Sequence, residues 1–140
     1  MAESLKCGKK TAESIVAGIK SRAAALDRKI VLCEGEDSRV VEAAAACVKE
    51  KIARIVLLGK EADIKAKNPS VDLTGVEIVD PETSPKLPLY AHLLYELRKA
   101  KGMTEEQAEE LSGDNTYFGV LMLKAGDVDG LVSGACHSTA

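Results

Sequence analysis

The sequence predicts an α/β domain with a layered architecture and a mainly parallel sheet. Short runs of β-branched and aliphatic residues alternate with longer segments of helical period, an order typical of parallel βα units. The 140 residues are 46% hydrophobic, so a chain of this length can bury a core without disulfides. Because only 3% of the residues are aromatic and none is Trp, we expect that core to consist of Ala, Val, Ile and Leu.

The first half of the chain contains three predicted helices and three predicted strands. Thr11 is expected to cap the first helix and Asp37 the second, because both side chains can accept a hydrogen bond from a first-turn amide. Gly59 closes the second strand, and the pairs Asn68-Pro69 and Asp80-Pro81 are typical chain breaks. Helices are therefore expected over residues 11–26, 37 to about 50, and 61–67, and strands over 29–33, 54–58 and 76–79.

The second half is predicted to be mostly helical. A helix is expected over 89–100, and another from Thr104, whose spacing to Gln107 fits a capping box. The apolar segment 114–124 is compatible with a strand or a buried helix. A strand is expected over 128–132, followed by a turn of small residues over 133–140. Because such a turn should lead into a helix, we expect the chain to be a piece of a longer protein.

Composition and charge argue against several classes of function. The net charge of −3 and the scarcity of aromatic residues do not fit a nucleic-acid-binding surface. The longest apolar runs are far shorter than the roughly 20 residues that cross a bilayer, and the first ten residues are too polar for a signal peptide. The four cysteines lack the spacing of zinc ligands, so we expect free, mostly buried thiols in the cytoplasm and no bound metal.

The turn at 133–139 is the strongest candidate for a binding site. Ser133, Ser138 and Thr139 carry hydroxyl groups, and Gly134 and Ala135 allow a ligand to approach the backbone closely. In open α/β sheets ligands bind beyond the carboxyl ends of strands, and a helix beginning near Ser138 would direct amides at an anion. These features predict a phosphate site. From the residues alone, however, an ordinary strand-to-helix turn is the simpler explanation.

Other polar residues have both a functional and a structural interpretation. His137 could act as a general base, but a role in orienting a neighbour is more common. Cys136 could be a nucleophile, but a small buried residue is the favoured interpretation. Three carboxylates follow the first strand, and helix capping accounts for Glu36 and Asp37. Arg98 belongs to a basic helix end, where it could stabilise the helix or hold a phosphate.

Six ordered segments together resemble the phosphate acetyltransferases (phosphotransacetylases), over residues from about 14 to 140. They are IVLCEGEDSR (30–39), ARIVLLG (53–59), IVDP (78–81), YELRKAKG (95–102), YFG (117–119) and DVDGLVSGACHST (127–139). Each segment is weak alone, but the ordered set is specific, and it favours the phosphate site over the ordinary turn at 133–139.

The resemblance implies reversible transfer of an acetyl group between CoA and phosphate, a reaction of acetate metabolism. The substrates would be acetyl-CoA, phosphate and acetyl phosphate, with no covalently bound cofactor. The family resembles the isocitrate/isopropylmalate dehydrogenases in fold, with two α/β domains around a cleft and a homodimeric assembly. Because its members are about twice as long, residues 1–140 are expected to form the N-terminal portion and to be inactive alone, with the second half absent.

The same resemblance implies roles for individual residues. The phosphate or acyl-phosphate end would bind near Ser133, Gly134, Ala135, His137, Ser138 and Thr139, and Arg98 would help to hold CoA through a phosphate. The family's general base lies beyond Ala140, so the catalytic residue is unknown within this chain. The family commonly has Pro in place of Cys33 and Ala or Val in place of Cys136, which weakens a nucleophilic role for Cys136. A phosphate butyryltransferase, a non-catalytic regulatory domain and a bare CoA- or phosphate-binding module remain alternatives.

Overall fold

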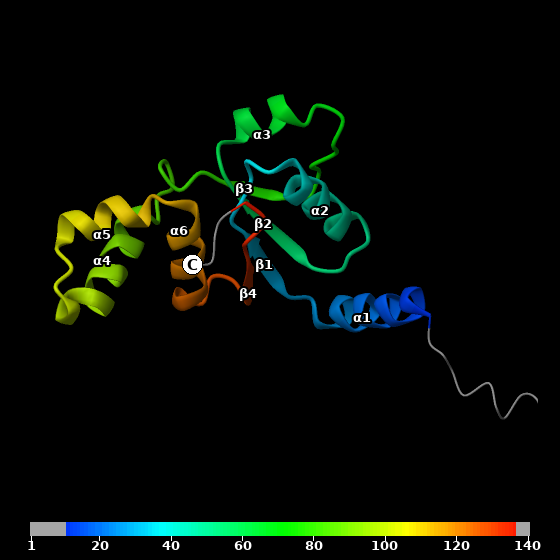
Figure 1. The fold of residues 1–140 in the computed structure, drawn as a ribbon, viewed down its shortest axis with the longest axis horizontal. Coiled ribbons are helices and arrows are strands. Elements are labelled where there is room, and N and C mark those ends of the chain that lie inside the picture. Colours follow the sequence, from blue (N-terminus) through cyan, green and yellow to red (C-terminus); the bar gives the residue numbers. More distant parts are fainter. Residues whose placement is uncertain (1–10, 137–140) are drawn as a thin grey trace, which may run out of the picture.

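The computed structural model describes residues 11–136, and they form one parallel sheet with helices on both faces (Figure 1). The sheet has the order β3-β2-β1-β4, and every neighbouring pair is parallel. In the register, Leu32 lies opposite Leu57 on one side and Val132 on the other. The strands are β1 (Lys29–Leu32), β2 (Arg54–Leu58), β3 (Glu77–Val79) and β4 (Gly130–Val132). The predicted α/β class with a parallel sheet is confirmed.

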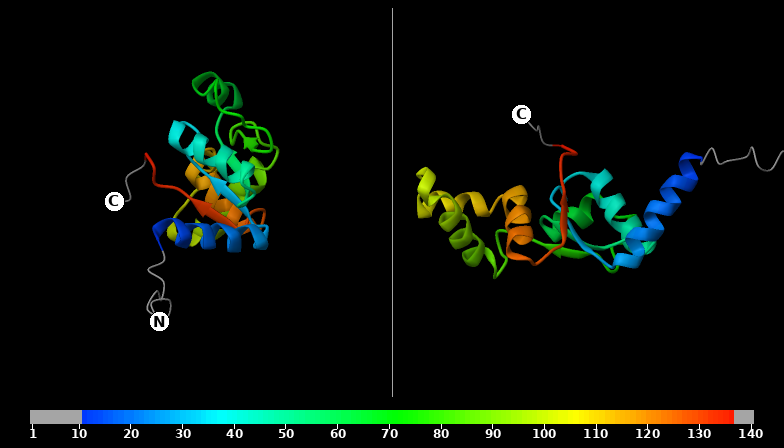
Figure 2. Two further views of the ribbon diagram at one scale, coloured as in Figure 1. Left: turned by 90° about the vertical axis from the view of Figure 1, so that its right-hand side faces the viewer. Right: turned by 90° about the horizontal axis from the view of Figure 1, so that it is seen from below.

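Two groups of helices cover the two faces of the sheet, as Figure 2 shows from below. The helices are α1 (Ala12–Leu26), α2 (Ser38–Lys49), α3 (Glu61–Lys67), α4 (Leu87–Arg98), α5 (Glu105–Ser112) and α6 (Asn115–Ala125), with a 3-10 turn η1 (Lys99–Lys101). Alternate strand residues divide between the faces. Val56 and Leu58 pack towards α4, α5 and α6, whereas Ile55 and Leu57 pack towards α2 and α3.

The predicted helix starts are confirmed by their caps. The Thr11 hydroxyl accepts the Ser14 amide at 3.2 Å, and the Asp37 carboxylate accepts the Arg39 amide at 2.9 Å. Both bonds of the capping box between Thr104 and Gln107 are present. These side chains satisfy amides that have no partner within the helix.

The ambiguous segment 114–124 is the helix α6. Asp114 accepts the amides of Thr116 and Tyr117 at 2.9 and 3.2 Å and so begins the helix. Gly126, with a φ of 82°, ends it in the left-handed conformation that glycine adopts readily. Phe118, Leu121 and Met122 are buried against the sheet. Long-range packing thus decides a choice that the local sequence leaves open.

Several boundaries differ from the predicted ones. Helix α4 begins at Leu87 rather than 89, because Pro88 lies in the first turn, where its missing amide is not needed. Strand β4 is restricted to Gly130–Val132, and the preceding Val128 packs in the core instead. Helix α1 extends away from the sheet, buries none of its residues, and leaves Ile15 and Ile19 about half exposed (Figure 1).

Candidate functional site

The candidate site lies where the order of the strands reverses direction. From β1 the chain proceeds through β2 to β3 on one side, and β4 then adds to the opposite side of β1. Ligands of open α/β sheets bind in the crevice beyond the carboxyl ends of strands at such a point. Glu34 lies just beyond the end of β1, and the turn from Ser133 to Cys136 follows β4. Parallel pairing therefore brings together two segments that lie about 100 residues apart in the sequence.

The carboxylate of Glu34 collects hydrogen bonds from this whole turn. Its Oε1 accepts the Ser133 hydroxyl at 3.1 Å and the amides of Gly134 and Ala135 at 2.5 and 2.9 Å. Its Oε2 accepts the amide of Cys136 at 2.5 Å and the thiol of the same residue at 2.8 Å. Glu34 as a whole residue is only 1% exposed. Successive backbone amides that point at one anion form a typical anion-binding concavity.

Glu34 is ionised in this environment. Burial on its own would raise the pKa of the carboxyl group, but hydrogen bonds from Cys136, Ala135 and Gly134 outweigh it and hold the pKa far below its usual range. A buried carboxylate needs such donors, because the charge has lost its contact with water. The turn therefore has the amide geometry of an anion site, and the anion is a side chain of the protein.

The structure brings some of the predicted site residues together and leaves others undescribed. Ser133, Gly134 and Ala135 lie in one turn, and Gly134 has a φ of +112° that suits a glycine. His137, Ser138 and Thr139 lie outside the described residues. Sequence reasoning missed Glu34, since its partners are distant in the chain and the only local signal is a carboxylate directly after a buried strand.

Cys136 corrects one expectation. It was expected to be buried, but it is exposed, because it follows the last strand at the edge of the sheet. Hydrogen bonding to Glu34, then burial and bonding to Glu36, raise the pKa of the Cys136 thiol to about 12. A thiol with such a pKa is neutral near pH 7, which does not fit a nucleophile. Of the other described cysteines, Cys33 is buried and Cys47 is partly buried.

Arg39 is a second residue that sequence reasoning missed. Its Nε and Nη2 donate to the two carboxylate oxygens of Asp37 at 3.1 and 2.6 Å, and Nη2 also donates to the Ala135 carbonyl at 3.0 Å. The hydrogen bonds from Arg39 lower the pKa of Asp37. Asp37 also caps α2, so the guanidinium connects the start of that helix to the candidate turn.

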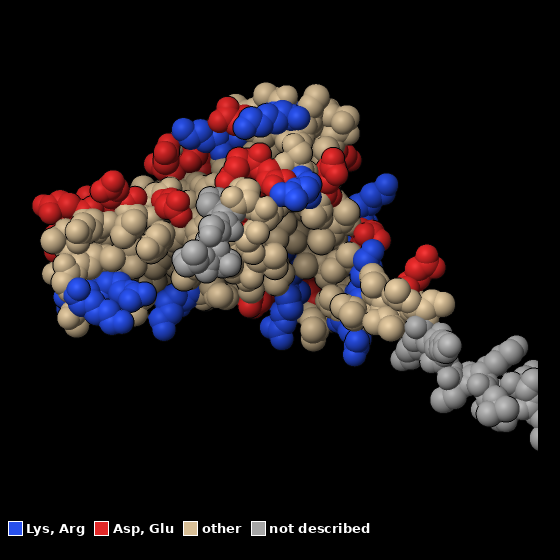
Figure 3. Space-filling model, viewed as in Figure 1, with Lys and Arg blue, Asp and Glu red and all other residues tan. Residues whose placement is uncertain are grey.

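Arg98 lies apart from this turn, in the last turn of α4. It lines a groove of about 690 Å³ together with Lys101, Gln107, Glu110 and Tyr117, and no residue of the 133–136 turn lines that groove. Three of the four residues from 98 to 101 are basic, namely Arg98, Lys99 and Lys101, and Figure 3 shows Lys and Arg side chains gathered on one edge of the molecule. The groove can accept an anionic ligand, because a planar guanidinium binds phosphate oxygens in pairs.

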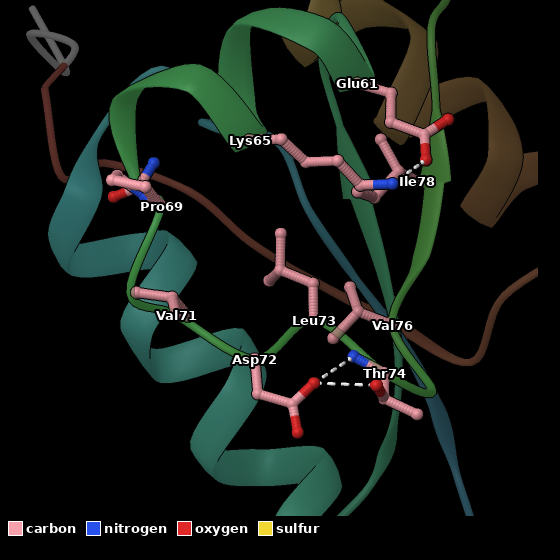
Figure 4. Close-up of a pocket in the computed structure, with 10 residues that line it drawn as sticks. Glu61, Lys65, Pro69, Val71, Asp72, Leu73, Thr74, Val76 and Ile78 are labelled. Carbon is pink, nitrogen blue, oxygen red and sulfur yellow. Dashed lines mark hydrogen bonds and ion pairs between the residues drawn. The ribbon is translucent and has the colours of Figure 1, made fainter.

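A further cavity of about 490 Å³ lies between α3 and the loop that leads to β3 (Figure 4). Its charged side chains are paired within the wall: Lys65 binds Glu61 at 2.6 Å, and Asp72 accepts the amide and hydroxyl of Thr74 at 3.0 and 2.6 Å. These pairs leave little charge to recognise a ligand, so this cavity is a weaker candidate than the turn.

Within residues 11–136, no three His, Cys, Asp or Glu side chains are grouped so that they could hold a metal ion. No helix in the same part of the chain is both long and apolar enough to span a bilayer.

Comparison with known proteins identifies the family. Residues 14–140 match the family described as phosphate acetyl/butaryl transferase. The chain is 48% identical over 127 residues to the phosphate acetyltransferase of Acetivibrio thermocellus and 51% identical over 116 residues to that of Escherichia coli K12. These matches cover 91% and 81% of the chain but only 38% and 16% of the two relatives.

Two solved structures share the fold. The EutD phosphotransacetylase of Staphylococcus aureus superposes with a TM-score of 0.82 at 35% identity, over 91% of this chain and 39% of that one. A phosphotransacetylase from Streptococcus pyogenes gives a TM-score of 0.85 at 32% identity, over 93% and 40%. The chain thus spans less than half the length of these relatives, and over almost all of its own length it belongs to the phosphate acetyl/butaryl transferase family.

Proposed function

We propose that the chain is the N-terminal part of a phosphate acetyltransferase, which transfers an acetyl group reversibly between CoA and phosphate. The observation that carries the proposal is the family match over residues 14–140, which includes both the turn and the basic groove. The substrates are acetyl-CoA, phosphate and acetyl phosphate. The intact enzyme is expected to be cytoplasmic and homodimeric.

In the proposed reaction a phosphate oxygen attacks the thioester carbonyl of acetyl-CoA and the CoA sulfur departs. The site must therefore hold two anionic reactants together and stabilise the oxyanion that develops on the carbonyl. Amides, hydroxyl groups and arginines can supply this stabilisation. Since the Cys136 thiol is neutral, transfer through an acyl-enzyme on this residue is disfavoured.

The proposal divides the two substrates between two places. The phosphate end of the substrate is assigned to the turn and the residues after it: Ser133, Gly134, Ala135, His137, Ser138 and Thr139. CoA is assigned to the groove at the end of α4, where Arg98 would bind one of its phosphates. The base that activates the CoA thiol in the reverse direction is assigned to the part of the protein beyond Ala140.

The test is a measurement of phosphate-dependent CoA release by the full-length protein. We expect release from acetyl-CoA to be clearly faster than release from butyryl-CoA. Faster release from butyryl-CoA would instead assign a phosphate butyryltransferase, the second activity that the family description includes. If neither thioester reacts while CoA still binds, the protein is a non-catalytic member of the family.

A further inference from the structure

We propose that Glu34 is a positioning residue that fixes the substrate-binding turn, and that the amides of residues 134–136 serve this purpose rather than binding substrate. The inference rests on the proposed function, because it concerns how the proposed phosphate site is built. It assigns a role to a side chain that does not itself touch the reacting atoms.

The first support is the convergence of donors on one carboxylate. Three successive amides, a hydroxyl and a thiol point at Glu34, and all five come from residues 133–136. The register explains how they meet: Leu32 and Val132 are partners in the ladder, so Glu34 and Gly134 each lie two residues beyond it. Both segments therefore leave the sheet at the same edge.

The second support is that the backbone around Glu34 is held in place. The amide of Gly35 donates to the Leu58 carbonyl at 3.1 Å, and the amide of Asp37 donates to the Glu34 carbonyl at 3.1 Å. A Cβ atom on Gly35 would lie 2.3 Å from the Leu58 oxygen, so the chain is packed tightly against β2 at this point. These contacts hold the backbone of Glu34 beside the turn, so that its carboxylate is within reach of the turn's amides.

The alternative is that Glu34 merely occupies an anion site that phosphate takes over during the reaction. In that case the incoming dianion would have to displace a buried carboxylate that has no access to water. If the displaced carboxylate stayed nearby, it would also repel the phosphate. A permanent contact between Glu34 and the turn avoids both the displacement and the repulsion. Gly134 and Ala135 then contribute to the site by their small size.

Arg39 makes a second contact that holds the same turn in place. Arg39 donates to the Ala135 carbonyl at 3.0 Å while both of its donating nitrogens are engaged by Asp37. The amides of the turn are thus held by Glu34 and one of its carbonyls by Arg39. The short segment 34–39 therefore determines the shape of the turn.

The first experiment compares Glu34→Gln with wild-type full-length enzyme. Gln keeps the size but loses the charge, and its own amide would face the amides of the turn. We expect KM for acetyl phosphate to rise by about tenfold or more, because the variant loses a network of charge-assisted hydrogen bonds. KM for CoA should change less than twofold. Glu34→Asp, which retains the charge, should recover part of the effect. Glu82→Gln makes the same change at the same edge, in a residue bound to Lys60, and should leave both constants unchanged.

The positioning role of Glu34 and the alternative, in which Glu34 competes with phosphate, predict opposite changes in KM for acetyl phosphate. If Glu34 only competes with substrate, Glu34→Gln lowers KM for acetyl phosphate, and this result would overturn the proposal. An unchanged KM would also overturn it. Lower stability and kcat with both KM values unaltered would indicate a general structural defect, and this result likewise contradicts a positioning role.

A second measurement needs no variant. In ligand-free full-length enzyme, the amides of Gly134, Ala135 and Cys136 should be protected from hydrogen–deuterium exchange, and saturating inorganic phosphate should add little protection. Rapid exchange that phosphate suppresses would refute the proposal. This measurement is independent of turnover. A lack of acetyltransferase activity would contradict the proposed function, but the exchange rates would still test the positioning role of Glu34.

Discussion

Helix α6 crosses the sheet at Gly119 so closely that a Cβ atom there would lie 2.6 Å from the Sγ of Cys33. Atoms of side chains do not approach this closely, so glycine is required if the helix is to pack on β1 at this depth. Cys33 directly precedes Glu34 in the sequence. The contact therefore connects the packing of the core to the residue that holds the candidate turn.

We expect Gly119→Ala to lower the free energy of unfolding by about 1–3 kcal/mol, because the added methyl group overpacks the core. Urea denaturation of the chain measures the change. Cys33→Ala in the same chain makes room for the methyl group and should recover part of the loss. Gly18→Ala is the control, since a Cβ there meets nothing within 4 Å and should stabilise α1 by about 0.5–1 kcal/mol. Additive effects of the two core substitutions would show that they do not share a contact.

Local signals in the sequence were sufficient to predict most helices and strands. The candidate site, by contrast, depends on contacts between segments that are far apart in the sequence. Thr104 and Gln107 identify a helix start because both partners lie within one turn of each other. The helix at 114–124 could not be separated from a strand, because its choice depends on packing against β1. The contacts of Glu34 and the exposure of Cys136 were missed for the same reason: their surroundings come from segments about 100 residues apart.

Removal of the Tyr90 hydroxyl should destabilise the α4–α6 side of the core. Tyr90 is 1% exposed, packs edge-on against Phe118, and donates its hydroxyl to Asp127, which also binds Lys86 at 3.0 Å. Tyr90→Phe keeps the ring but loses a hydrogen bond to a carboxylate, so we expect a loss of about 1.5–3 kcal/mol in urea denaturation at pH 7. Tyr117→Phe, at a half-exposed tyrosine, should change stability by much less.

This loss should depend on pH. The hydrogen bond from Tyr90, followed by that from Lys86, lowers the pKa of Asp127 in the folded chain. The resulting stabilisation is present above the unfolded pKa of about 4 and disappears as the pH falls through the lower, folded value. The difference between wild type and Tyr90→Phe should therefore shrink below about pH 4. A difference that stayed constant into that range would mean that the hydroxyl does not bind the ionised carboxylate.

Cys136 should react slowly with alkylating agents although it is exposed. With a pKa of about 12, its thiolate fraction at pH 8 is more than about a thousandfold below that of an ordinary thiol. Mass spectrometry after iodoacetamide treatment should show slow labelling of Cys136 in the folded chain and fast labelling in urea. Since bonding to Glu34 is the largest cause of the raised pKa, Glu34→Gln should accelerate the folded reaction. Rapid labelling of the folded wild-type chain would contradict the contact.

Arg98 should contribute to CoA binding and not to phosphate binding. It lines the groove at the end of α4, and the 133–136 turn contributes nothing to that groove. A charge-assisted contact to a phosphate contributes about 1.5–3 kcal/mol, so Arg98→Ala in the full-length enzyme should raise KM for CoA roughly 10- to 100-fold. KM for acetyl phosphate should remain within about twofold of wild type.

A matched variant separates a specific contact from the general charge of this helix end. Lys99 follows Arg98 directly but binds Glu96 at 2.8 Å and does not line the groove. Lys99→Ala removes the same charge from the same helix end, and it should alter KM for CoA only slightly, by an amount that disappears at high ionic strength. Arg98→Lys retains the charge but loses the paired geometry of the guanidinium, so it should restore only part of the affinity. Equal effects of Arg98→Ala and Lys99→Ala would mean that Arg98 acts only through the positive field of the helix end.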